Sequence, residues 1–316
     1  MSSNKVIGIA VIILIGSLVI WQKGNDTSGP AGNGKRVLIG ATVYTTQSEF
    51  HVDVIKGMKK VADAAGAKLV ISDANGEATK QNNDIEDFVE QKVDGVIIYG
   101  VDPVAVVQSA EYAVTRGIPV ITCDMELKTD KVSTFIGSDN TEAGRVAGEY
   151  AKKYIETNLG GKARIGVVTW LASVAQQQRL AGFKKGIGQT EGIKIVATQD
   201  GDGREKAMAS AENIMQANPD LDMFFGTNEG STIGCFSAVQ SAGKRKIKII
   251  GIDISNDAIR GLEEGSIFGL VAQQPVLLGE LSVKALFDLL EGKTLAKNIE
   301  CPIKLVTKEN ASEFRK

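Results

Sequence analysis

Residues 95–124 read GVIIYGVDPVAVVQSAEYAVTRGIPVITCD, and this stretch decides the fold class. Two short apolar runs, Gly95–Tyr99 and Ile118–Cys123, flank a segment of helical length, Pro103–Arg116. Both runs carry apolar residues on both faces, which is typical of parallel strands covered by helices on either side. The stretch therefore predicts a strand–helix–strand unit with a right-handed crossover.

The same alternation extends in both directions from this unit. Upstream, the predicted strands and helices are, in chain order, Arg36–Val43, Phe50–Gly66, Lys68–Ser72 and Ala78–Lys92. Downstream, a helix at Thr141–Asn158 precedes a second series of Arg164–Val168, Gln176–Gly188, Lys194–Ala197, Glu205–Ala217, Met223–Gly226, Thr232–Ala242 and Lys246–Ile252. The two series read as rough copies, and the seam between them falls near Ser138-Asp139-Asn140.

The end of the chain supplies one more strand (Phe268–Ala272), a long helix (Pro275–Glu291) and a terminal strand (Ile303–Thr307). A lone strand–helix pair after two copies indicates that the chain crosses back to complete the first lobe. We therefore predict an α/β fold of two doubly wound parallel-sheet lobes joined by a three-crossing hinge. The predicted first lobe comprises residues 36–138 and 274–301, and the second comprises 139–273 and 302–316. Because open α/β sheets bind ligands at the carboxyl ends of their strands, a cleft between the two lobes is the expected site.

The N-terminal segment indicates where the protein is located in the cell. Val6–Trp21 is an unbroken apolar run between Lys5 and Lys23, so residues 1–23 are either a cleaved signal peptide or a membrane anchor. No cysteine near its end offers a lipidation site, and the flank Trp21-Gln22-Lys23 suits a membrane interface, which favours the anchor. Residues 24–35 are rich in Gly, Ser, Asn and Pro and are predicted to be a flexible tether. Either reading places the folded part outside the cytoplasm.

Composition excludes several classes of function. The net charge of −2 gives no basic field for nucleic acid. The three cysteines, Cys123, Cys235 and Cys301, are far apart without a C-x-x-C, so we expect buried thiols and no disulfide framework. A single histidine, His51, makes a metal cluster hard to build, and neither a metal nor a cofactor is expected.

Motifs for nucleotides and catalysis are missing. The first strand–helix connection, Tyr44–Glu49, has no glycine, whereas close approach of a pyrophosphate requires glycines there. Gly292-Lys293-Thr294 resembles the end of a P-loop, but Phe287 stands where that motif has glycine. No G-x-S-x-G elbow occurs. A His51–Cys123 pair is a conceivable catalytic arrangement, so an enzyme acting on a sugar-like substrate is the alternative. We expect a binding protein without enzymatic activity.

Polar residues gather at the predicted strand ends. The candidate ligand-binding residues are Ser48, Phe50, His51, Asp124, Arg179, Asn228, Asp253 and Gln273, with Gln177 beside Arg179. Carboxylates and amides bond several hydroxyls, an arginine donates in a fixed fork, and an aromatic face packs against the C–H side of a sugar ring. Turn and cap preferences explain Asp or Asn at single positions, but the whole set favours a small polar ligand, with a monosaccharide as the expected class.

The chain from Arg36 onward resembles the ribose/galactose-type periplasmic binding proteins, whose type I fold is shared with the lactose-repressor family. The matching stretches are Ile118–Asp124, Gly137–Asn140, Arg179–Phe183, Thr227–Glu229, Gly251–Asp253 and Ala272–Pro275. The resemblance implies sugar contacts at Phe50, Asp124, Arg179, Asn228, Asp253 and Gln273. It also implies hinge crossings near Asp139, Gln274 and Cys301. A repressor is rejected, because an apolar segment stands where a helix-turn-helix would precede the first strand.

The chain departs from the ribose-type pattern at positions that bear on which sugar it binds. The pattern has two adjacent aromatics where this chain has Phe50-His51, and commonly Asp-Arg where this chain has Asp124-Met125. It also has an aromatic near Gly201 or Gly203. The expected pocket is roomier and less aromatic, which argues against ribose itself and leaves xylose, another monosaccharide or a sugar derivative as the expected ligand. The implied membrane partner is the permease of an ABC importer or a sensor histidine kinase, reached through lobe closure.

Overall fold

The computed structural model describes residues 36–315. The predicted signal peptide or anchor and the tether lie outside these residues. Within the described part, no helix combines the length and apolar character needed to cross a membrane.

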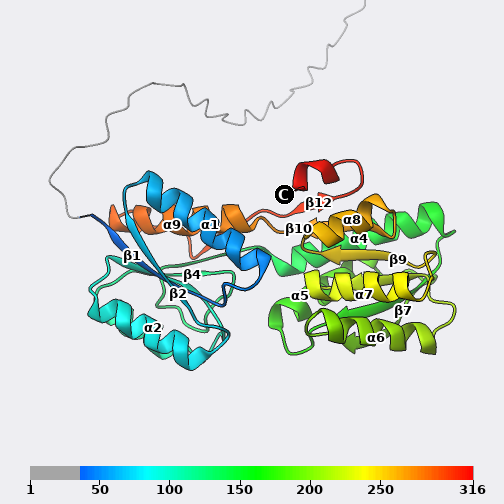
Figure 1. Cartoon of the computed structure of the whole chain (residues 1–316), viewed down its shortest axis with the longest axis horizontal. Helices are drawn as coiled ribbons and strands as arrows, with labels where there is room; N and C mark the ends of the chain where they lie inside the picture. The colour runs from blue at the N-terminus through cyan, green and yellow to red at the C-terminus, as the bar shows by residue number, and fades with distance from the viewer. Residues whose placement is uncertain (1–35, 316) are drawn as a thin grey trace, which may run out of the picture. The chain divides into compact units, whose positions relative to one another are not determined.

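The first sheet has six strands in the order β11-β5-β4-β3-β1-β2, all paired in parallel. Its strands are β1 (Leu38–Val43), β2 (Lys68–Asp73), β3 (Gly95–Tyr99), β4 (Val120–Cys123), β5 (Thr134–Gly137) and β11 (Asn298–Glu300). Helices α1 (Glu49–Ala64) and α9 (Pro275–Leu290) pack side by side on one face (Figure 1). Helices α2 (Ala78–Glu90) and α3 (Val107–Thr115) cover the other.

The second sheet has the order β12-β10-β9-β8-β6-β7. Its strands are β6 (Ala163–Thr169), β7 (Ile193–Asp200), β8 (Met223–Gly226), β9 (Lys248–Ile252), β10 (Ile267–Ala272) and β12 (Lys304–Val306). Helices α4 (Asn140–Asn158) and α5 (Val174–Ile187) cover one face. The other carries α6 (Arg204–Ala217), α7 (Glu229–Ser241) and α8 (Asn256–Glu263), with the 3₁₀ turn η1 (Ala311–Phe314) packed beside α8. Strand β12 runs antiparallel to β10. The sequence predicts a parallel sheet in each lobe, and the second sheet differs from this prediction at its edge strand β12.

The chain passes between the sheets at three places. It leaves β5 for α4, returns from β10 to α9, and passes from β11 to β12. These passages are bonded to one another. Cys301 N–H donates to Gly137 O at 2.8 Å, and the Gln274 side chain donates to Pro302 O at 2.8 Å. The Cys301 thiol lies 3.6 Å from Gln274 O, and Asp139 caps α4 by accepting from Glu142 N–H.

Four elements were not anticipated from sequence. Strands β5 and β11 span four and three residues, too few for a periodicity to show. Helix α8 and the 3₁₀ turn η1 span eight and four residues, and the sequence analysis assigns neither. Helix α3 begins at Val107 and not at Pro103, because the Asp102 carboxylate accepts from the N–H groups of Val104 and Ala105 and holds a turn there.

Glycines allow α4 and α5 to touch backbone to backbone. A methyl group on Gly144 would lie 1.9 Å from Arg179 O, and one on Gly182 would lie 1.9 Å from Thr141 O. Neither contact can be relieved by a side-chain rotation, because the obstructing atoms are main-chain carbonyls. The position of α5, and of Arg179 upon it, therefore depends on this close approach.

We expect Gly182→Ala to lower the free energy of unfolding by about 1–3 kcal/mol, as overpacking does in a tight core. Denaturant titration of the purified chain measures the change. Gly230→Ala is the matched control, because a methyl there meets no atom closer than 3.6 Å and sits in helix α7, where alanine is favoured over glycine. Equal stability of both variants would contradict the packing argument.

Candidate ligand-binding site

Two aspartates occupy equivalent places in the two lobes. Asp124 follows β4 and Asp253 follows β9, and these strands hold the same position in their sheets. Both residues adopt left-handed backbone, with φ of 64° and 71°. Each donates its N–H to the neighbouring strand, Asp124 to Ile136 O at 2.8 Å and Asp253 to Val271 O at 2.9 Å. A left-handed non-glycine residue costs on the order of 1–3 kcal/mol, and such strain concentrates at functional positions.

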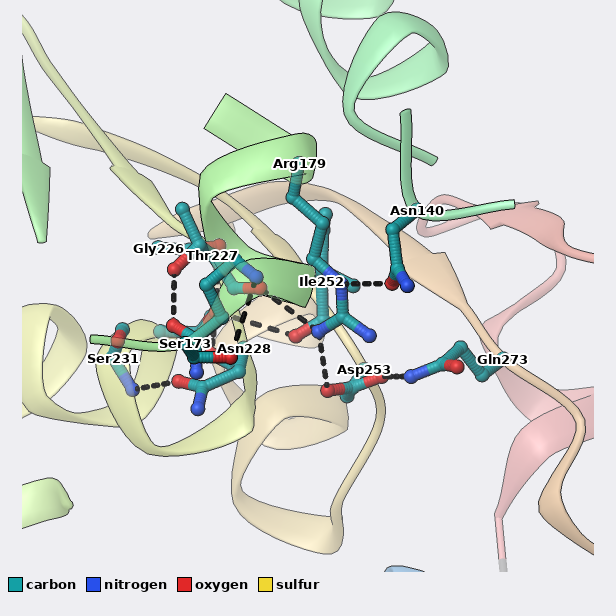
Figure 2. Close-up of polar contacts among 12 residues, drawn as sticks. Asn140, Ser173, Arg179, Gly226, Thr227, Asn228, Ser231, Ile252, Asp253 and Gln273 are labelled. Carbon is teal, nitrogen blue, oxygen red and sulfur yellow. Dashed lines mark hydrogen bonds and ion pairs between the residues drawn. The ribbon is translucent and has the colours of Figure 1, made fainter. Parts of the chain in front are cut away.

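Arg179 organises the second lobe's half of the site (Figure 2). Its Nε donates to Asn140 Oδ1 at 2.8 Å and its Nη1 to Thr227 O at 3.0 Å. Nη1 also lies 3.4 Å from Asp253 Oδ2, and the side-chain exposures of Arg179 and Asp253 are 8% and 13%. Gln273 completes the chain by donating from Nε2 to Asp253 Oδ1 at 2.7 Å. The network joins the start of α4, helix α5 and the strand ends of β8, β9 and β10.

The first lobe contributes an aromatic cluster around His51. The ring of His51 stacks on Tyr44 at 5.3 Å, meets Tyr99 at 4.9 Å and meets Phe50 edge-on at 5.9 Å between centroids. Ser48 caps helix α1 by accepting from His51 N–H, and its hydroxyl also contacts His51 Nδ1. Burial lowers the pKa of His51 to about 4 although the charges of Asp73 and Asp253 oppose the shift, so the imidazole is neutral near pH 7.

The charged groups of the two lobes act on one another. Burial raises the pKa of Asp124, the charge of Arg179 and a hydrogen bond from Tyr99 lower it, and the charge of Asp253 raises it further. Burial, with Asp124 beside it, likewise raises the pKa of Tyr99 well above its usual value. Asp124 and His51 of the first lobe are thus within electrostatic reach of Asp253 in the second.

Two remaining predicted residues have local roles. Asn228 caps helix α7 through Oδ1, which accepts from Ser231 N–H at 2.8 Å, so its side-chain NH₂ is what it can offer a ligand. Gln177 is exposed and donates to Leu171 O. Its neighbour Gln176 is the buried amide, accepting from Trp170 N–H at 2.9 Å and from the Thr227 hydroxyl.

Asn140 and Tyr99 were not selected as site residues from sequence. Asn140 begins α4 directly after the first crossing, and Tyr99 is the last residue of β3. A search for polar residues after each strand passes over both, since one starts a helix and the other looks like a strand aromatic. Among residues 36–315, no group of His, Cys, Asp or Glu side chains is arranged to hold a metal ion.

A family model described as a periplasmic binding protein domain matches residues 39–294. The chain belongs to the periplasmic binding proteins. The ribose import binding protein of Bacillus subtilis strain 168 is 34% identical over 291 residues, which are 92% of each chain. A structure from Mycobacterium smegmatis in complex with β-D-fucofuranose is 27% identical with a TM-score of 0.80, covering 88% of this chain and 93% of that one.

A second solved relative is an ABC transporter solute binding protein of Agrobacterium vitis bound with α-D-tagatopyranose. It is 27% identical with a TM-score of 0.78, and covers 88% of this chain and 97% of that one. The predicted resemblance and the two-lobed α/β fold of this periplasmic binding protein are confirmed. Its relatives are binding components of transport systems, in agreement with the prediction that the chain is not an enzyme.

We expect Asp124→Asn to raise the melting temperature of the ligand-free protein at neutral pH. The folded chain binds a proton at Asp124 more tightly than the unfolded chain, so the carboxylate opposes folding above the unfolded pKa. That penalty disappears as the pH falls through the raised pKa, and the gap between variant and parent should narrow on acidification. Asparagine keeps an acceptor for Tyr99.

Calorimetric melting between pH 7.5 and pH 4 measures this gap. Exposed Asp130→Asn is the control and should follow the parent chain throughout. A gap that is absent at pH 7.5, or that widens in acid, would count against a buried carboxylate at Asp124.

Proposed function

We propose that this periplasmic binding protein captures a monosaccharide or a close sugar derivative outside the cytoplasm and signals occupancy by closing its lobes. The observation that carries the proposal is the pair of equivalent aspartates, Asp124 and Asp253, joined electrostatically through Arg179. Acceptors on both lobes and a guanidinium between them suit a compact ligand with hydroxyl groups on opposite sides. The fucofuranose and tagatopyranose in the two solved relatives support this ligand class.

The site offers complementary chemistry from each lobe. Phe50 and the neutral His51 present ring faces and edges, and Asp124 offers carboxylate oxygens. The second lobe offers the Asp253 carboxylate, the Asn228 amide NH₂ and the Gln273 amide. A ligand held by both sets stabilises only the closed arrangement, so binding shifts the population toward it. We place the hinges of this motion at Asp139, Gln274 and Cys301, where the chain passes between the sheets.

The expected location outside the cytoplasm favours a membrane protein as the partner, and there are two candidates. Relatives named for ribose import and for ABC transport support a permease as the receiver of the closed form. The apolar run at residues 6–21 and the lack of a lipidation cysteine support an anchored protein, for which a sensor histidine kinase is the second candidate. With either partner, closure brings surfaces of the two lobes together, and the partner binds the combined surface of the closed form.

A thermal-shift screen of residues 35–316 against pentoses, hexoses and inositols tests the proposal, because a ligand that binds only the folded state raises the melting temperature. The hit should lose affinity by more than about tenfold in Asp253→Ala, since a charged hydrogen-bond partner contributes about 1.5–3 kcal/mol. Titration calorimetry measures the loss. Unchanged affinity would remove Asp253 from the site, and a screen without any hit would remove the sugar class.

Arg179→Ala should weaken binding of the same sugar far more than Arg204→Ala. Arg179 is buried and oriented by Asn140 and Thr227, and its loss leaves the Asp253 carboxylate without its guanidinium. Arg204 is half exposed and bridges Glu229 and Asp257, away from that network. Calorimetric titration of both variants compares them directly. Equal losses would show that Arg179 is not the guanidinium that the ligand requires.

A further inference from the structure

The charges at the site do not balance. Two carboxylates, Asp124 and Asp253, act on one another, and one guanidinium, Arg179, acts on both. Arg179 bonds within the second lobe, to Asn140, to Thr227 O and to Asp253. Its charge is therefore compensated by Asp253, which leaves Asp124 in excess.

His51 does not supply the missing positive charge. The Ser48 hydroxyl accepts from the His51 backbone N–H and lies against His51 Nδ1. Burial lowers the pKa of His51 to about 4, so the ring carries a single proton and is neutral near pH 7. The imidazole thus offers a neutral donor, and the cluster keeps one uncompensated carboxylate.

Among residues 36–315, the positive charge that acts on Asp124 is that of Arg179, which belongs to the second lobe. The hydrogen-bond partner of Asp124 on its own lobe is the neutral Tyr99 hydroxyl. The next residue, Met125, is uncharged and packs its sulfur against Gly100. Closing two lobes over an uncompensated carboxylate removes water from it, and burial of an unpaired charge is unfavourable. A ligand that brings one positive charge would relieve this cost, whereas a hydroxyl would not.

We propose that the ligand of this site carries a protonated amine, as an amino sugar or aminopolyol does, and that Asp124 receives the ammonium group. The inference rests on the proposed function and narrows its ligand class. Hydroxyls of the same ligand meet Asp253, Gln273 and Asn228 of the second lobe. Sugar acids and sugar phosphates are excluded, because they would add a second negative charge to the excess already present.

Matched sets of ligands test the proposal in titration calorimetry at pH 7 and low salt. Each set holds a 2-amino-2-deoxyhexose (glucosamine, galactosamine or mannosamine), its parent hexose and the corresponding uronic acid. In the unmodified protein, the amine of the set that fits should bind roughly tenfold more tightly than its parent, since a charged hydrogen bond exceeds a neutral one by about one such factor. The uronic acid should be the weakest of its set.

Asp124→Asn then separates charge from shape. This variant keeps an acceptor of the same size, and we expect it to lose the tenfold preference while still binding the parent hexose. Arg204→Ala is the control, and it should keep the preference because its charge pairs with Glu229 and Asp257. The comparison uses a ratio within each variant, so a general loss of affinity does not imitate the expected result.

The remaining outcomes are distinct. If a hexose binds as tightly as its amine in every set that binds, or if Asp124→Asn keeps the preference, the ammonium inference is wrong and the sugar-binding function stands. If no member of any set, and no sugar of the wider screen, binds, the proposed function fails and the inference falls with it.

Discussion

The buried contact between Arg179 and Asp253 is the interaction on which the second half of the site depends. A guanidinium almost removed from water is stable only when it has hydrogen-bond partners, and Asn140, Thr227 O and Asp253 accept from its Nε and Nη1. These partners come from α4 and from the ends of two strands, so one side chain ties three elements together. The contact also depends on the packing of the two helices. Asn140 on α4 lies within reach of Arg179 on α5 because glycines allow the two helix backbones to touch.

A second constraint is the repetition of one backbone strain in both lobes. Asp124 and Asp253 each turn into the left-handed region directly after corresponding strands, and each is held there by an N–H bond to the next strand. Glycine would adopt this conformation at lower cost. The backbone conformation therefore does not by itself require a carboxylate at either place. Two rough copies of one lobe nevertheless present two acceptors toward a shared centre.

The sequence was sufficient for the alternation of strands and helices and for residues that directly follow strands, because parallel strands align their carboxyl ends at one edge. That rule selected Asp124, Asp253 and Gln273 as candidates, and the family resemblance implied a sugar contact at Arg179 inside its helix. It did not select Asn140 or Tyr99, whose partners lie 39 and 25 residues away along the chain. It also selected the exposed Gln177 and not its buried neighbour Gln176, because the sequence does not show which of two adjacent helix positions faces the interior. Strands β5 and β11 were not predicted because three or four residues show no periodicity, and the strand at β12 was predicted without its antiparallel direction.

The passages between the sheets connect the site to the proposed closure. Gln273 bonds Asp253, and the next residue, Gln274, bonds Pro302 O in the neighbouring passage. Cys301 in turn bonds Gly137 O beside the first passage. A backbone rotation at one passage must therefore be matched at the others or break these bonds, which favours a concerted motion with few intermediate poses. Since Gln273 belongs to both the site network and this bonded group, a ligand that fixes Asp253 and Gln273 also fixes the angle at the second passage. In the proposed motion, ligand binding and closure are therefore coupled through a single dipeptide, Gln273-Gln274.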